Sequence, residues 1–355
     1  MCMDRHGIDH DIPLTWNMSL PSHTFSSGVV IIFPDWIYGL LPFCGPGMRK
    51  DIWMRETAFI EEMCIFFHKN GLGTLTLSVP PESGIIPFDD LIISATNIPD
   101  VYMTIKTLMK EHSCNLNKSV LLGHGFGMLF MCELIRYGLK PAGYIIASGI
   151  YSDIESILTQ KYFPFKEVNL SSLGFEQRPA LDPESALIVK NMGKILQATR
   201  KGKEKIRIRE QSQMMEYHIP KKLFAEESSP SSLSSVLDAP TLILHGSGDL
   251  DISVTNAFFL ETKLRQKCNS VSRIVMLDRD HWFREMPQEY SDRVSERLSN
   301  ECVHRPLDQR FLKNARIFIS DVLKIRCTKY DTNNVPHVHD AVHASSPMQE
   351  MEKIV

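Results

Sequence analysis

One stretch of the sequence decides the fold: Ser119-Val120-Leu121-Leu122-Gly123-His124-Gly125-Phe126-Gly127-Met128-Leu129. Its first four residues form an apolar run that predicts a buried strand. Three glycines at alternate positions then predict a tight turn, and the apolar periodicity of residues 126–137, followed by Gly138, predicts a helix. A strand that leads through a strained turn directly into a helix can expose the residue at the turn, here Gly125, at the carboxyl edge of a parallel sheet.

Apolar runs and helical stretches alternate on both sides of this motif. The other runs that predict strands are 28–33, 73–79, 144–147, 241–244 and 273–277. The other predicted helices are 53–70, 97–111 and 307–325. Because strands that alternate with helices form parallel βαβ units, the sequence predicts an α/β fold with a mostly parallel central sheet and helices on both faces.

The alternation stops near Tyr151 and resumes near Asp238. The segment between them is polar and helix-prone, and it ends in a loop rich in serine and proline. We therefore predict a discontinuous core of residues 1–150 and 239–326, with residues 151–238 inserted as a helical lid. The polar, aperiodic tail 327–355 is predicted to be disordered.

Two features outside the core bear on possible partners. We interpret the basic run 200–209 as a solvated helix face on the lid, and the alternative is peripheral contact with an anionic membrane surface or an anionic ligand. The tail contains His337, His339 and His343. Without a rigid frame to orient these imidazoles, we predict no metal site there.

The composition excludes several classes of protein. A formal net charge of −3 argues against nucleic-acid binding, which needs dense positive charge. The eight cysteines form no metal-like C-x-x-C pair, and buried thiols are typical of a reducing compartment. A polar N-terminus and the lack of a long apolar run predict a cytoplasmic protein without a signal peptide or membrane span. The glycine turn lacks the G-x-G-x-x-G spacing of a dinucleotide site, which argues against a Rossmann-type protein.

Two further polar positions follow late strands. Asp249 comes shortly after the run 241–244, and His281 comes shortly after the run 273–277. A nucleophile, an acid and a histidine in this chain order, each after a strand, form the arrangement of a hydrolytic triad. Asp249 is the preferred acid, and Asp251 is its competitor. Gly125 occupies the position of the nucleophile, so the attacking hydroxyl group is missing.

These motifs together resemble the α/β-hydrolase family, and more narrowly its serine aminopeptidase and monoglyceride lipase-like (lysophospholipase-like) branch. Residues 120–127 resemble the LLGHSMGG elbow of that branch, 239–249 its acid-bearing strand and turn, and 277–290 its histidine loop. The resemblance covers residues 28–150 and 238–300, roughly, while the lid matches poorly. It implies a hydrolase of acyl esters, above all lipid-like ones, that works without a cofactor.

The strand that should lead to the oxyanion hole departs from the pattern of that branch. The branch has His-Gly at the strand end, where this chain has Phe33-Pro34, followed by Asp35. Proline has no N–H to donate, and the Asp35 carboxylate would bring negative charge to the place where an oxyanion should form. Together with His124 and Phe126, which flank Gly125, these residues make up the expected oxyanion and pocket region.

Two functions fit this pattern. The first is a catalytically degenerate protein, not an enzyme, that keeps a pocket for a small apolar or acyl-containing ligand or for a protein partner. The alternative is an active carboxylic-ester hydrolase of the monoacylglycerol or lysophospholipid kind. Such an enzyme would use a non-standard nucleophile, for which Ser247 is one candidate, or a water activated by His281 and Asp249. The joint change at Gly125 and Pro34 favours the first function.

Overall fold

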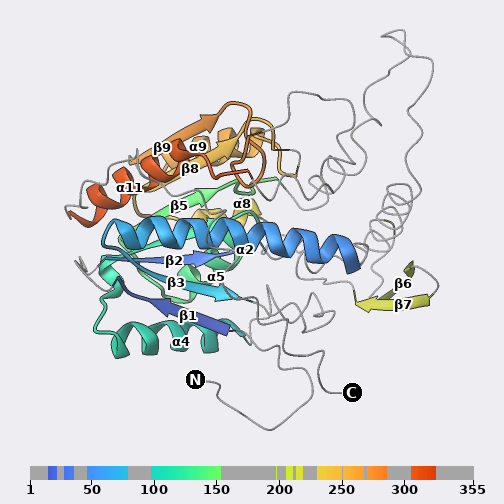
Figure 1. The fold of residues 1–355 in the computed structure, drawn as a ribbon, viewed down its shortest axis with the longest axis horizontal. Coiled ribbons are helices and arrows are strands. Elements are labelled where there is room, and N and C mark those ends of the chain that lie inside the picture. The colour runs from blue at the N-terminus through green and yellow to red at the C-terminus, as the bar shows by residue number, and fades with distance from the viewer. Residues whose placement is uncertain are drawn as a thin grey trace, which may run out of the picture.

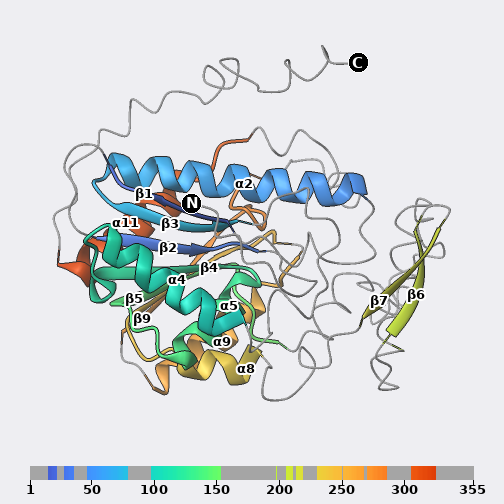
Figure 2. The ribbon, with the colours of Figure 1, turned by 90° about the horizontal axis from the view of Figure 1, so that it is seen from below.

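The computed structural model describes residues 15–21, 28–35, 46–78, 97–152, 197, 205–210, 213–218, 230–249, 251–267, 270–285 and 305–324. Within these residues, a seven-stranded sheet forms the centre of the molecule, and helices lie against both of its faces (Figures 1 and 2).

The sheet is parallel except at one edge. In spatial order its strands are β1 (Thr15–Ser19), β3 (Gly73–Ser78), β2 (Val29–Phe33), β4 (Ser119–His124), β5 (Gly143–Ala147), β8 (Thr241–Gly246) and β9 (Val271–Met276). The edge strand β1 runs antiparallel to β3, and the other neighbouring pairs are parallel. Because β4 lies between β2 and β5, its carboxyl end opens at the middle of the sheet edge.

Two helical layers bury the sheet. On one face pack α4 (Asn97–Glu111), α5 (Gly127–Tyr137) and α9 (Thr255–Arg265), and on the other pack α2 (Pro46–Lys69) and α11 (Gln309–Leu323) (Figure 2). Strand β2 divides its side chains between the layers: Ile31 and Phe33 join the first, and Val30 and Ile32 join the second. Such strands are buried on both faces, which explains their unbroken apolar sequence.

This architecture is the α/β-hydrolase fold that the sequence predicts. A mostly parallel sheet carries helices on both faces, and a glycine turn joins its central strand β4 to helix α5. The six strands predicted from apolar runs all exist within a few residues of the expected bounds. The predicted helix 97–111 has the bounds of α4, and the last predicted helix corresponds to α11.

The interpretation of the basic run 200–209 as a helix face is wrong for its second half. Residues Lys205–Glu210 form strand β6, which pairs antiparallel with β7 (Gln213–His218), and this hairpin stands apart from the central sheet in both views (Figures 1 and 2). The period-two alternation of charged and β-branched residues in this run is a strand signal that the helix interpretation overlooked. The edge strand β1 was likewise not predicted.

Other predictions fall on residues that the structure does not describe. These include most of the lid, where the short helix α8 (Pro230–Leu233) precedes the return to the core, and the whole tail 327–355 with its three histidines. The domain boundaries therefore stay a prediction. Among the described residues, no helix is both long and apolar enough to cross a bilayer.

Phe59 of α2 ties the second helical layer to the sheet edge. Its fully buried ring lies 5.6 Å from the ring of Phe311 on α11 and 4.5 Å from the ring of His124 at the end of β4. A ring that contacts two other elements fills a volume that its neighbours cannot easily close.

We expect Phe59→Ala to lower the free energy of unfolding by about 3–5 kcal/mol, because it removes a buried ring and leaves a cavity. The matched control is Ile65→Ala on the same helix, where the side chain is 48% exposed and the expected change is within about 0.5 kcal/mol. Urea denaturation of both variants measures these changes, and similar losses for the two would contradict the packing described.

Candidate functional site

Gly125 lies in the turn that joins β4 to α5. Its φ of +52° falls in the left-handed region that favours glycine, and its N–H donates to Ala147 O at 2.9 Å. Gly127, the first residue of α5, passes so close to β2 that an added Cβ would lie 2.5 Å from Pro34 O. The turn therefore places the amino end of α5 directly against the end of β2.

Asp249 and His281 follow β8 and β9, and their buried side chains form a hydrogen-bonded pair. Nδ1 of His281 lies 2.9 Å from Oδ2 of Asp249. The other oxygen of Asp249 accepts the backbone N–H groups of Asp251 and Ile252, each at 2.8 Å. Of the two aspartates that the sequence left open, Asp249 is therefore the one whose carboxylate contacts His281, while Asp251 orients that carboxylate through its backbone.

Contacts with three other strands fix the loop that carries His281. The N–H of Gly248 donates to Arg279 O at 2.9 Å. The carbonyl oxygen of His281 accepts from Oγ of Ser148 at 3.2 Å and from Nε2 of His124 at 2.9 Å. The loop that carries His281 is thereby fixed against the ends of β8, β5 and β4.

The second ring nitrogen of His281 contacts Asp35, which lies just after β2. Nε2 is 2.9 Å from Oδ2 of Asp35, and Oδ1 of the same carboxylate accepts the N–H of Phe126 at 3.3 Å. A Cβ added at Gly125 would lie 2.5 Å from Cγ of Asp35 and would overlap its Oδ2. The buried carboxylate of Asp35 thus occupies the space in which a side chain at position 125 would stand.

The carboxylate of Glu56, on α2, accepts hydrogen bonds from three residues around Asp35 and His281. It accepts the N–H of Asp35 at 2.8 Å, the Nε1–H of Trp282 at 2.9 Å, and a hydrogen bond from Nδ1 of His124 at 2.9 Å. The rings of His124 and His281 lie 4.5 Å apart. Three carboxylates and the imidazoles of His124 and His281 therefore form one buried hydrogen-bonded network across the ends of β2, β4, β8 and β9. The buried imidazole of His245 adjoins it, with Nε2 3.4 Å from Oδ2 of Asp249.

Most groups in the network stabilise one another's charged forms, and Asp35 is the exception. Burial by itself lowers the pKa of His281, but the Asp249 and Asp35 carboxylates raise it well above its ordinary value. Burial raises the pKa of Asp249 and Glu56, yet His281 and His124 respectively hold these two pKa values below the ordinary range. Burial also raises the pKa of Asp35, which the hydrogen bond from His281 only partly opposes. Because both ring nitrogens of His281 face carboxylate oxygens, the imidazolium is the form that satisfies them both.

Both backbone groups that could bind an oxyanion at this site already have partners. In this fold the donors are the N–H after the nucleophile position and an N–H in the loop after the neighbouring strand. The first is the N–H of Phe126, which donates to Asp35, and the second corresponds to the N–H of Asp35, which donates to Glu56. The N–H groups therefore serve carboxylates of the protein itself.

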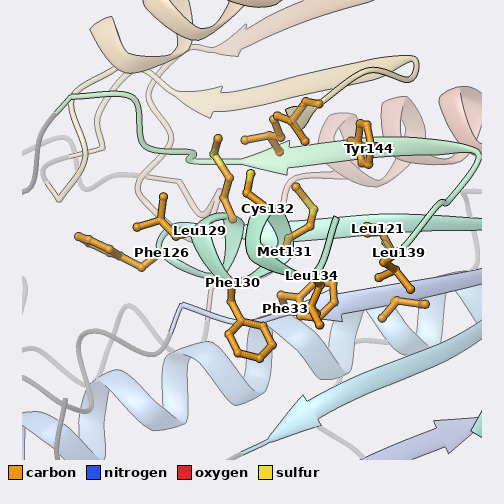
Figure 3. Packing of buried hydrophobic residues seen from close by; sticks show 14 of the residues in the cluster. Phe33, Leu121, Phe126, Leu129, Phe130, Met131, Cys132, Leu134, Leu139 and Tyr144 are labelled. Carbon is orange, nitrogen blue, oxygen red and sulfur yellow. The ribbon is translucent and has the colours of Figure 1, made fainter. Parts of the chain in front are cut away.

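The other residues that the sequence singled out lie in the interior. Phe33 packs against Phe130 of α5, with ring centroids 5.9 Å apart, on the side of the sheet shown in Figure 3. Phe126 belongs to the same apolar cluster, and His124 is fully buried between Glu56 and the His281 carbonyl. Of these residues, Phe126 contributes its backbone N–H to the network and His124 contributes its two ring nitrogens.

Sequence reasoning missed Glu56 and Trp282. Glu56 had a detectable signal: it is an acidic residue in line with the buried stripe Phe59, Met63 and Phe67 at helical spacing. A carboxylate on an apolar stripe needs a buried partner. Which partner it takes could not be read from the chain, because His124 and Asp35 come from other strands.

The ligand atoms of Asp249, Asp251 and His281 lie within 4.8 Å of one another, close enough in principle for a cation. Asp249 and His281 are, however, already hydrogen-bonded to each other through the atoms that would be ligands. We therefore assign no metal to this group.

No protein-family model matches the sequence, and no curated protein matches it either. Among solved structures, the chain is similar to the esterase domain of a Rhodothermus marinus protein, with 13% identity and a TM-score of 0.42 over 76% of this chain and 90% of that one. It is also similar to a Pyrococcus furiosus esterase, with 12% identity and a TM-score of 0.45 over 83% and 82% of the two chains. A third similar structure is a 2,6-dihydroxy-pseudo-oxynicotine hydrolase, with 16% identity and a TM-score of 0.48 over 92% and 70%. Similarity at this level concerns the fold, so the interpretation of the site depends on its own geometry.

The overlap at Gly125 predicts an energetic coupling to Asp35. We expect Gly125→Ala to destabilise the protein by roughly 2–4 kcal/mol, because the new methyl group meets the Asp35 carboxylate and the backbone is left-handed. In an Asp35→Ala background the overlap with the carboxylate is removed, and what remains is the backbone term of about 1–2 kcal/mol and a close contact, 2.9 Å, with the Cβ at position 35. A double-mutant cycle with chemical denaturation measures the coupling.

The matched control for this cycle is Gly138→Ala. Gly138 also has a positive φ, of +123°, but its added Cβ would meet nothing closer than the Tyr102 hydroxyl at 4.0 Å. This substitution should not couple to Asp35. Equal coupling of the two glycines to Asp35 would contradict the overlap.

Asp280 gives the site region a separate pH dependence. Burial raises the pKa of this carboxyl to about 6, and its Oδ1 accepts the N–H groups of Trp282 and Arg284. Because the folded protein binds this proton more tightly than the unfolded chain, the contribution of Asp280 to stability is greatest below pH ~4 and falls as the pH rises through about 6.

Asp280→Asn keeps an oxygen acceptor and removes this titration. Between about pH 4 and pH 7 we expect wild type to lose roughly 2–3 kcal/mol more stability than the variant does. Urea midpoints measured across this range test the expectation. A difference between the two proteins that does not change with pH would contradict it.

Proposed function

We propose that this protein is a non-hydrolytic α/β-hydrolase-fold protein that acts by binding. One observation carries the proposal: the carboxylate of Asp35 fills the space above Gly125 and bonds both His281 Nε2 and the Phe126 N–H. Those are the groups that a serine hydrolase uses to activate its nucleophile and to hold the oxyanion.

The chemistry of acyl transfer explains why this matters. Without a hydroxyl at position 125 no acyl-enzyme can form there, and in a serine hydrolase loss of the nucleophile reduces turnover by about a million-fold. What remains in such an enzyme, roughly 10³ to 10⁴ over water, comes from the oxyanion hole and substrate binding. Here the two N–H groups that correspond to the oxyanion donors are already hydrogen-bonded to carboxylates of the protein. This supports the loss of the residual rate enhancement as well.

The finer assignment follows the sequence. We propose descent from the serine aminopeptidase and monoglyceride lipase-like branch, with Gly125 at the former nucleophile position. We also propose a cytoplasmic protein whose pocket accepts a small apolar or acyl-containing ligand or a protein partner. The segment inserted between β5 and β8 would determine that ligand or partner and any peripheral contact with a membrane.

The second candidate is a carboxylic-ester hydrolase, which the intact His281–Asp249 hydrogen bond favours. In this reading His281 would take a proton from water, which then attacks the ester. That step requires an unprotonated Nε2 that faces water, whereas Nε2 faces Asp35 at 2.9 Å. The second candidate therefore requires Asp35 to move away from the imidazole.

A serine-reactive fluorophosphonate probe tests the first proposal. We expect no labelling of the full chain under conditions that label a serine esterase of the same fold completely. Stoichiometric labelling of any serine, including Ser247, would overturn the proposal.

Turnover of short p-nitrophenyl esters tests the second candidate. If His281 activates water, His281→Gln should abolish the activity and Asp35→Asn should raise it, since the amide weakens the hold on the imidazole. We expect wild type and both variants to hydrolyse these esters at the same background rate, which would remove the second candidate.

A further inference from the structure

Two separate donors hold the carboxylate of Asp35, as donors in a binding site hold a ligand. Its two oxygens are engaged separately, Oδ2 by Nε2 of His281 at 2.9 Å and Oδ1 by the N–H of Phe126 at 3.3 Å. One donor is an imidazole ring and the other is a backbone N–H in the turn before an eleven-residue helix, α5. Two donors that converge on the two oxygens of one carboxylate make an arrangement selective for that group.

The space around this carboxylate is also shaped for it. Position 125 has no side chain, and any Cβ there would overlap Oδ2 of Asp35. Asp35 and His281 are 2% and 1% exposed, so the contact is made away from water. Charge-assisted hydrogen bonds are stronger in such surroundings, and an unpaired donor is correspondingly costly.

The charges that face this position come from several elements. His281 contributes the positive charge, with Asp249 behind it, while Glu56 and His124 lie on the side of α2 and β4. Glu56 bonds the backbone N–H of Asp35 and not its carboxylate. The donors to the Asp35 carboxylate that the described residues show are therefore His281 and Phe126.

We propose that His281, the Phe126 N–H and the space above Gly125 form a carboxylate-binding site, and that Asp35 occupies it as an internal ligand. In wild type the site is closed to external carboxylates and to acyl oxyanions. Without the Asp35 side chain it accepts a small carboxylate such as formate. The inference deepens the proposed function. It rests on that function in one respect: it treats this centre as a binding site.

The test is chemical rescue of Asp35→Ala by formate. Formate has three non-hydrogen atoms, so the limit on affinity per atom for very small ligands corresponds to a Kd of roughly 1 mM. At ~100 mM formate this limiting affinity corresponds to a rise of at most roughly 4–7 °C in the midpoint of thermal unfolding of Asp35→Ala. Equal concentrations of formamide, the neutral analogue, and of chloride should raise it far less.

Two controls separate the site from general effects of salt. Wild type should show no formate-specific shift, because Asp35 already fills the site. Asp308→Ala is the matched variant: it removes another carboxylate that accepts a helix N–H, from Arg310, in a setting where arginines and not an imidazole are its charged partners. An equal response of Asp35→Ala, Asp308→Ala and wild type to formate would overturn the inference.

A measurement on wild type decides the matter if Asp35→Ala does not fold. Nitrogen-15 NMR of the His281 ring should show two protonated nitrogens at neutral pH, as an imidazolium between two carboxylates requires. An unprotonated Nε2 would overturn the inference, because that nitrogen could not then donate to Asp35. These outcomes do not depend on fluorophosphonate labelling, so failure of the site and failure of the proposed function are distinguishable.

Discussion

The imidazole of His281, held between the carboxylates of Asp249 and Asp35, is the contact on which the rest of this centre depends. A buried imidazolium is unfavourable alone, and it is stabilised here because each of its N–H groups meets a negative oxygen within 2.9 Å. Asp35, which the ring holds, in turn links the end of β2 to the turn before α5 through the Phe126 N–H. The same interactions that keep the positive charge in the interior therefore also join the segments that follow β2, β8 and β9.

Glu56 is the third carboxylate of the network, and hydrogen bonds to its own oxygens stabilise it there. A buried glutamate next to two buried aspartates would repel them, but its oxygens accept from Trp282, His124 and the N–H of Asp35. Every carboxylate oxygen in the cluster thus has a donor, and the donors come from segments that are far apart in the sequence. Networks satisfied in this way specify one arrangement of their elements more strongly than they add to stability.

The sequence predicts the strands, helix and turn around this centre better than it predicts the contacts between the side chains within it. Apolar runs and glycine turns have local causes, so the strands, α4 and the turn at Gly125 could be read directly from the chain. Asp35 was expected to bring negative charge near the oxyanion position, but its contact with His281 joins the ends of β2 and β9, and no local pattern encodes that distance. The hairpin β6–β7 was missed for a different reason, since the charge of the run outweighed its period-two pattern in the interpretation.

The overlap between position 125 and Asp35 makes these two residues change together or not at all. A serine at 125 collides with the carboxylate while Asp35 is present. Loss of Asp35 alone leaves the imidazolium of His281 without one of its two partners. Each of the two single changes is thus expected to destabilise the protein as it stands. The centre is separated from its catalytic counterpart by a barrier in sequence space, and ordinary stepwise substitution will tend to preserve it as it is.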